Sequence, residues 1–319
     1  MSSAMVKLGD VINVHYGKAL KADQRVSNGS VHVFGSSGIV GNHDKTLCSY
    51  PTIIIGRKGS VGAITWAPDG GWIIDTAYYV EIKDNNKLDL RYLFYILSGI
   101  DLTKKTITTS IPGLNRDDLY DTFIKLPPFE EQKRIVDLLD KAEGIRQKRE
   151  QAIKLADDFL RATFATMYGN PITNPKKWPV HLMGEIIEFK GGNQPPKSDF
   201  IFEPKQGYIR LVQIRDFKSD KYATYIPQEK AKRIFEVDDV MIARYGPPVF
   251  QILRGLSGSY NVALMKASPK ENIRKGFIFY LLQLPEYHDV VVKNSERTAG
   301  QTGVNLELLN KFNVPLPPI

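Results

Sequence analysis

A segment of about 40 residues, 126–169, constrains the fold of this chain more than any other part of its sequence. Pro127 and Pro128 forbid a helix upstream and pre-set the first helical turn, because proline has no amide hydrogen and a fixed φ angle. Two glutamates follow in the first turn, where negative charge suits the helix dipole. Gly169 and Pro171 end the helical pattern with a C-cap and a stop. At ~1.5 Å per residue, we predict one helix of roughly 60 Å.

Apolar and small side chains recur along this segment in alternating steps of three and four residues. That spacing predicts a seam against another helix, and a helix of such length is typical of a coiled coil rather than of a globular core. The residues that we assign to the coiled-coil or partner face are Ile135, Leu138, Leu139, Ala142, Ile145, Ala152, Ala156 and Phe159.

The parts of the chain before and after the helix repeat one another. On each side β-branched runs between glycine-rich turns predict strands, at 51–55, 61–66 and 72–82 in the first part, followed by a short apolar helix at 90–97. Four stretches of the first part match the second in the same order: 8–12 with 183–187, 53–59 with 240–246, 92–97 with 277–282, and the LPP at 126–128 with that at 316–318. Such an ordered series indicates two copies of one domain.

We therefore predict an α/β (α+β) protein in which two similar globular domains, 1–128 and 171–319, are joined by a long coiled-coil-forming helix at 129–170. The second copy stops at its LPP, where the helix of the first copy begins. Either the sequence is cut there or the packing partner comes from elsewhere. We predict that the helix pairs with the same helix of a second chain, as a homodimer, or with a separate fragment.

Composition limits the class of protein. A single cysteine, Cys48, excludes internal disulfides and fits the reducing cytoplasm. No apolar run approaches the ~18 residues of a membrane span. The net charge is +8, and residues 171–319 contribute most of it, with 21 Lys and Arg against 15 Asp and Glu. A basic balance of this kind suits a polyanionic partner such as nucleic acid.

The arrangement resembles the specificity subunit of type I restriction–modification systems. The resemblance rests on Leu126-Pro127-Pro128-Phe129-Glu130-Glu131-Gln132 leading into the long helix, and on the LPP that recurs at the end of the second copy. It implies that the two domains are target-recognition domains, each reading half of a split site in double-stranded DNA, and that the chain itself is not catalytic. It further implies docking of methyltransferase (M) subunits and a restriction (R) subunit, which would use S-adenosylmethionine, ATP and Mg²⁺, while this chain would hold no cofactor or metal.

DNA contacts are expected on loops rich in Arg, Lys, Asn, Gln and Ser, which supply phosphate and base contacts. Arg57 and Arg244 are the foremost candidates, because both copies place an arginine after the same strand. A requirement of the fold is the alternative reading of that match. The candidates are Arg57, Lys58, Ser60, His43, Lys45, Lys104 and Lys105 in the first domain, and Asn193, Gln194, Lys197, Gln213, Arg215, Arg244, Tyr245, Gln301 and Thr302 in the second.

Two other functions stay open at this level. Asp69, Glu81 and Lys83 fit the PD…(D/E)-x-K pattern of Mg²⁺-dependent nucleases. Asp69, however, stands in a Pro-Asp-Gly-Gly sequence, which is common in turns, and the second copy has no equivalent. The other function is that of a purely structural adaptor built around the long helix. No phosphate-binding loop, methyltransferase motif or zinc pattern is present in the sequence.

Overall fold

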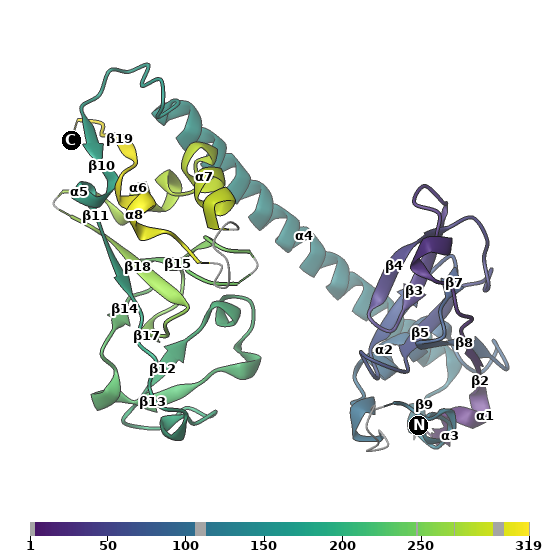
Figure 1. The fold of residues 1–319 in the computed structure, drawn as a ribbon. Coiled ribbons are helices and arrows are strands. Elements are labelled where there is room, and N and C mark those ends of the chain that lie inside the picture. The colour runs from purple at the N-terminus through teal and green to yellow at the C-terminus, as the bar shows by residue number, and fades with distance from the viewer. Residues whose placement is uncertain (1–3, 106–112, 247, 271, 296–302, 319) are drawn as a thin grey trace. The chain divides into compact units, whose positions relative to one another are not determined.

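The computed structural model describes residues 4–105, 113–246, 248–270, 272–295 and 303–318. By its backbone contacts the chain divides into two units, Met1–Glu150 and Gln151–Ile319 (Figure 1). The division falls inside the longest helix, so each unit consists of one globular part and the half of the helix attached to it.

The long helix is confirmed as α4, Phe129–Tyr168, an element of 40 residues. It begins directly after the two prolines, where the carbonyl oxygen of Pro128 accepts from the backbone amides of Glu131 and Gln132. It ends at Gly169, whose φ of +83° is the left-handed conformation of a C-cap glycine and whose amide donates to the Ala165 carbonyl.

The first unit contains short strands and helices in addition to its part of α4. In chain order these are β1 (Ala4–Lys7), α1 (Leu8–Val11), β2 (Ile12–Tyr16), the 3₁₀ turn η1 (Ala22–Gln24), β3 (Val31–Gly35), β4 (Gly38–His43), β5 (Thr52–Gly56), β6 (Ile64–Ala67), β7 (Trp72–Ile73), β8 (Ala77–Ile82), α2 (Leu90–Ser98), η2 (Leu102–Lys105), α3 (Arg116–Tyr120) and β9 (Phe123–Leu126).

Three sheets organise these strands, in the orders β2-β8-β5-β6, β4-β3-β7 and β1-β9. The strand β5 lies inside its sheet, between β8 and β6. All three of its isoleucines are buried, as expected for a β-branched strand that is covered on both faces. The region predicted as one strand, 72–82, is two strands: β7 pairs with β3, and β8 pairs with β2 and β5.

The second unit continues after α4 with the following elements. They are β10 (Val180–Leu182), α5 (Met183–Ile186), β11 (Ile187–Gly191), η3 (Lys197–Asp199), β12 (Tyr208–Val212), η4 (Ile214–Phe217), η5 (Asp220–Tyr222), β13 (Tyr225–Pro227), η6 (Gln228–Lys230), β14 (Ile234–Phe235), β15 (Val240–Ala243), β16 (Ile252–Leu253), β17 (Gly258–Tyr260), β18 (Leu264–Pro269), α6 (Lys275–Leu281), α7 (Pro285–Ser295), α8 (Leu306–Asn310) and β19 (Asn313–Pro315).

The internal repeat is confirmed at the level of topology. The sheet β11-β18-β15-β16 has the strand order of β2-β8-β5-β6, and the pair β10-β19 corresponds to β1-β9. The helices α5 and α6 follow β10 and β18 as α1 and α2 follow β1 and β8, and α8 precedes β19 as α3 precedes β9. The sheet β13-β12-β17-β14 corresponds to β4-β3-β7, since β12 pairs antiparallel with β13 and parallel with β17 as β3 does with β4 and β7. The strand β14 and the helix α7 are additional in the second unit.

Each end of α4 is anchored in the globular part of its own unit. In the first unit Ile135 and Val136 pack against the core around Leu88 and Tyr92. In the second unit Phe164 and Tyr168 join the core. These contacts tie the direction of each helix end to the sheet beside it.

The middle of α4 leaves its apolar side chains uncovered. Leu138 is 63% exposed, Ile145 54% and Phe159 69%, although Ile135 of the same series is half buried against the first core. Leu139, Ala142, Ala152 and Ala156 are exposed as well. Nowhere in the described residues is there a helix whose length and hydropathy would let it cross a membrane.

Candidate nucleic-acid interface

The end of strand β5 fixes the backbone of Arg57 in the first unit. Gly56, the last residue of β5, lies so close to the following turn that a Cβ at this position would stand 2.0 Å from the Ser60 carbonyl oxygen. The Arg57 amide donates to the Thr76 carbonyl (2.9 Å), and the Arg57 carbonyl accepts from the Leu114 amide (2.9 Å). The arginine therefore joins the start of β8 to the segment that leads into α3.

The side chain of Arg57 lies among aromatic rings. Its guanidinium carbon is 5.1 Å from the ring centroid of Tyr16 and 5.7 Å from that of Tyr78, and its Nη1 donates to the Asp75 carbonyl (3.2 Å). A second guanidinium, that of Arg116, lies 5.3 Å from the same Tyr16 ring. Tyr16 is 48% exposed, and no carboxylate among the described residues forms an ion pair with either arginine. The result is an accessible aromatic ring flanked by two uncompensated positive charges.

Tyr78 makes the base of this cluster rigid. It is 1% exposed, packs edge-on against Tyr16, and donates its hydroxyl hydrogen to the Leu114 carbonyl (2.9 Å). Burial raises the pKa of Tyr78 to about 12, so the hydroxyl stays protonated and continues to donate at neutral pH.

The second unit places Arg244 in the same backbone setting. Its amide donates to the Ala263 carbonyl (2.8 Å) and its carbonyl accepts from the Val304 amide (3.1 Å), as Arg57 does with Thr76 and Leu114. Its guanidinium carbon lies 5.0 Å from the ring of Tyr245, the next residue along the chain. The side chain thus also stacks on a tyrosine, but the tyrosine comes from a different position.

The candidates of the first unit fall into two groups. Lys58 and Ser60 are exposed in the turn that follows Arg57, and Lys58 bridges to Gly113. Lys104 is exposed in η2, whose Leu102 packs beside Gly62, and Lys105 is the last residue of η2. His43 and the exposed Lys45 belong to the smaller sheet instead. His43 is only 9% exposed and packs edge-on against Trp72, so it is the least accessible of the candidates whose exposure the structure describes.

In the second unit several candidates gather at one end of two sheets. The Asn193 amide donates to the Tyr260 carbonyl, while Gln213 follows Val212, whose carbonyl accepts from the Asn261 amide; both lie at the strand ends near Arg244. Arg215 is exposed and stacks on Tyr222. Gln194 and Lys197 are exposed on the loop after β11. Gln301 and Thr302 lie outside the described residues.

Two residues of the cluster were absent from the predictions made from the sequence, Tyr16 and Arg116. Tyr16 ends a strand directly before a glycine, and Arg116 follows Leu114-Asn115, which stand where the second copy has Val304-Asn305. The signal that could have found Arg116 is its difference from Leu306, the residue that follows Asn305 in the second copy. Residues that differ between two copies at equivalent positions are candidates for what distinguishes the copies.

The residues of the nuclease alternative are engaged separately in the first unit. Glu81 accepts from His15 (3.0 Å) and Asn13 (3.4 Å), which holds its pKa below the ordinary value, and Lys83 donates to the Gly9 carbonyl (2.5 Å). Asp69 stands in the turn between β6 and β7. In the part of the chain that the structure describes, no group of three or more His, Cys, Asp or Glu side chains could hold a metal ion. The nuclease alternative gains no support.

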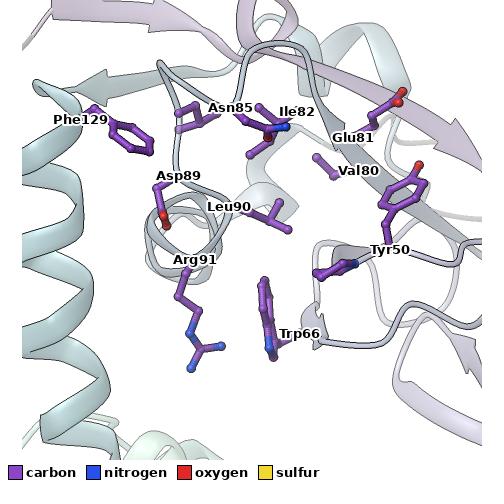
Figure 2. Close-up of a pocket in the computed structure, with 12 residues that line it drawn as sticks. Tyr50, Trp66, Val80, Glu81, Ile82, Asn85, Asp89, Leu90, Arg91 and Phe129 are labelled. Atoms are coloured by element: carbon purple, nitrogen blue, oxygen red, sulfur yellow. The ribbon is translucent and has the colours of Figure 1, made fainter.

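A pocket of about 610 Å³ opens at the other end of the first unit's main sheet (Figure 2). Trp66, Leu90 and Phe129 line it, with Arg91 stacked over the Trp66 ring at 4.9 Å. Arg91 also pairs with Asp140 of α4 (2.9 Å). This end of the domain therefore faces its own helix, whereas the Arg57 cluster lies at the opposite end of the sheet.

Comparison with known proteins identifies the family to which the chain belongs. The model of the family described as "Type I restriction modification DNA specificity domain" matches residues 2–155 and again residues 175–319. The chain belongs to this family. The two matches correspond to the two units, so each unit is one specificity domain.

Individual relatives agree with this assignment. Over 310 residues the chain is 22% identical to the type I restriction enzyme EcoBI specificity subunit of Escherichia coli, covering 85% of this chain and 64% of that protein. It is 20% identical to the MjaVIII specificity subunit of Methanocaldococcus jannaschii, covering 75% and 62%. The chain thus spans less than two thirds of the length of these relatives. The crystal structure of the S subunit of a type I restriction–modification system from M. genitalium shares the fold, with a TM-score of 0.58 at 18% identity over 98% of this chain and 84% of that one.

Proposed function

We propose that this chain is a non-catalytic specificity subunit that reads a bipartite site in double-stranded DNA, one half-site per unit. The observation that carries the proposal is the recurrence of Arg57 and Arg244 in one backbone setting, each stacked on a tyrosine and each at the end of the same strand of a duplicated domain. Arginine at such a position supplies a charged fork for phosphate or base edges.

The long helix is the natural device for setting the separation of the half-sites. Two linked readers gain affinity through effective concentration, and a stiff connector rejects half-sites at the wrong separation. B-DNA repeats each ~34 Å, so a helix of roughly 60 Å suits half-sites about one turn or more apart. The anchored ends of α4 support this role, because a loosely attached helix would not transmit a fixed spacing.

The catalytic steps belong, in this proposal, to partner subunits. A methyltransferase subunit would take its methyl group from S-adenosylmethionine and flip the target adenine, while a restriction subunit would use ATP and Mg²⁺. The exposed apolar face of α4 and the pocket beside Phe129 offer surfaces for such partners. We place the assembly in the cytoplasm, where its DNA substrate and reduced Cys48 are expected.

The proposal predicts a split DNA motif and a charge-dependent interaction. Mapping of methylated adenines in cells that carry this chain and its partners should give two short half-sites separated by a fixed gap. A duplex with that motif should then bind the complex with a steep salt dependence, because phosphate contacts release counterions. We expect Arg57→Ala combined with Arg244→Ala to weaken binding at least tenfold and to lower the salt slope by about 2, measured by fluorescence anisotropy across a salt series.

A matched control comes from lysines at the far end of each unit. Lys87 and Lys311 are exposed cations paired with Asp84 and Glu307, so replacing both by alanine removes the same charge away from the proposed interface. That double variant should bind the duplex as the wild type does. Equal losses in the two double variants, or Mg²⁺-dependent cleavage by the purified chain that disappears in Asp69→Ala, would contradict the proposal.

The exposed apolar face of α4 leads to a separate prediction about assembly. Side chains such as Leu138, Ile145 and Phe159 form an apolar stripe that favours association with a second helix. We expect the isolated chain to be a dimer by light scattering at micromolar concentration, and Leu138→Glu with Ile145→Glu to convert it to a monomer. A wild-type chain that stays monomeric there would count against pairing with a second copy.

A further inference from the structure

The two units share one arginine and differ in the residues around it. The strands β2 and β11 are equivalent and equally long, and β2 ends in Tyr16 where β11 ends in Gly191. After the equivalent N-cap residues Asn115 and Asn305, the first unit has Arg116 and the second has Leu306. Arg57 and Arg244 are therefore common to both units, whereas the Tyr16 and Arg116 side chains exist only in the first.

The second unit shows how the shared arginine is supported without Tyr16. A Cβ on Gly191 would lie 3.4 Å from Nη1 of Arg244, so the missing side chain leaves that guanidinium uncovered on this side. The stacking ring comes instead from Tyr245, whose counterpart in the first unit is Lys58. In both units a tyrosine ring therefore stacks on the arginine, but the other side chains beside the arginine differ.

The two arginines of the first unit, Arg57 and Arg116, also differ in their hydrogen bonds. Arg57 already donates to the Asp75 carbonyl and is held by two rings, which fixes the position of its charge. Arg116 lies over the rings of Tyr16 and Tyr120, and no hydrogen bond of its guanidinium to a described residue is found. Among the described residues the guanidinium is oriented by stacking, and none of them takes its outer donors, which suits a planar, bidentate partner.

Resting on the proposed function, we propose that Arg57 and Arg244 each hold a DNA phosphate, and that Tyr16 and Arg116 form a base-reading subsite of the first unit in which Arg116 recognises guanine. Phosphate contacts are the same at every sequence, and so a residue common to both units serves them. A contact that reads a base has to differ when the half-sites differ. Bidentate bonds from arginine to O6 and N7 make guanine the base that a free guanidinium fork fits.

The experiment uses the full chain in complex with its methyltransferase partner and a pool of duplexes with 30 randomised base pairs as the probe. Bound duplexes are sequenced, and affinities are then measured for the selected motif and for every single-base change in it. Arg116→Lys keeps the charge and loses the bidentate fork. We expect it to lose about 5- to 150-fold of discrimination at one guanine of one half-site, with an unchanged salt slope. Arg116→Leu, the residue of the second unit, should lose the same discrimination.

Arg57→Ala is expected to behave in the opposite way. It should weaken binding to all duplexes by a similar factor, lower the salt slope by about 1 and leave the motif intact. Arg91→Lys is the matched control, because Arg91 also stacks on aromatic rings but lies at the other end of the sheet. It should retain the full discrimination of the wild type.

The outcomes separate this inference from the function on which it rests. A wild-type complex that selects no motif would contradict both the base-reading subsite and the proposed function. A wild-type motif that persists unchanged in Arg116→Lys and Arg116→Leu would overturn the subsite and leave the proposed function standing. Loss of one base preference in Arg57→Ala would reverse the two roles assigned to the arginines.

Discussion

Replacing Gln132 with alanine is expected to destabilise the first unit by about 3 kcal/mol, although the residue lies in the first turns of a largely exposed helix. Gln132 is 0% exposed. Its Nε2 donates to the carbonyls of Lys87 (2.8 Å) and Pro127 (2.9 Å), and its Oε1 accepts from the Asp89 amide (2.8 Å). The alanine variant leaves three backbone groups without these partners, the buried Pro127 carbonyl and the partly buried Lys87 carbonyl and Asp89 amide. The measurement is urea unfolding followed by peptide-resolved hydrogen exchange, in which β5 and β8 should lose protection at lower urea.

Two variants control this prediction. Gln147→Ala, on the exposed part of the same helix, removes a side chain whose one hydrogen bond to a described residue is with Glu143, and it should change stability by less than about 0.5 kcal/mol. Gln132→Glu keeps the shape but presents a carboxylate to two carbonyl oxygens, so at pH 7 it should be at least as damaging as alanine. If Gln132→Ala unfolds at the same urea concentration as the wild type, the three hydrogen bonds do not anchor the helix.

Replacing Tyr168 with alanine is expected to destabilise the second unit by about 4 kcal/mol, through the cavity that the lost ring leaves. Tyr168 is 5% exposed, stacks on Phe164 at 5.4 Å and packs against Trp178 and Phe277. Its hydroxyl donates to the Pro315 carbonyl (2.6 Å), and burial raises its pKa. In the same exchange experiment the strands β15 and β18 should lose protection, while β5 and β8 keep theirs.

The hydroxyl and the ring of Tyr168 can be separated. Tyr168→Phe retains the packing and should cost only about 1 kcal/mol for the lost hydrogen bond. Met167→Ala, one residue earlier and 67% exposed, should be close to neutral. Loss of protection in both units after Tyr168→Ala would mean that the units unfold together and that the anchor is not local.

These two anchors show how far the sequence predicted the fold. The prolines and Gly169 located α4 correctly, because helix ends are set by local backbone geometry. The role of Gln132 was not predicted, since a glutamine in a first helical turn is usually solvated and only its neighbours make it buried. The split of 72–82 into β7 and β8 was likewise missed. Both halves are apolar enough for a strand, and nothing local tells which sheet each one joins.

The sequence by itself determined the long helix, the duplication and the two equivalent arginines, because capping residues are local signals and a repeat is visible by comparing the chain with itself. Only the tertiary structure decided which side chains surround Arg57. Tyr16, Arg57 and Arg116 are far apart in the sequence, and they meet because β2, β8 and β5 pair in one sheet and the Leu114 amide bonds to Arg57. Strand order and register are set by the packing of the whole core, so no local pattern could have placed these three residues together.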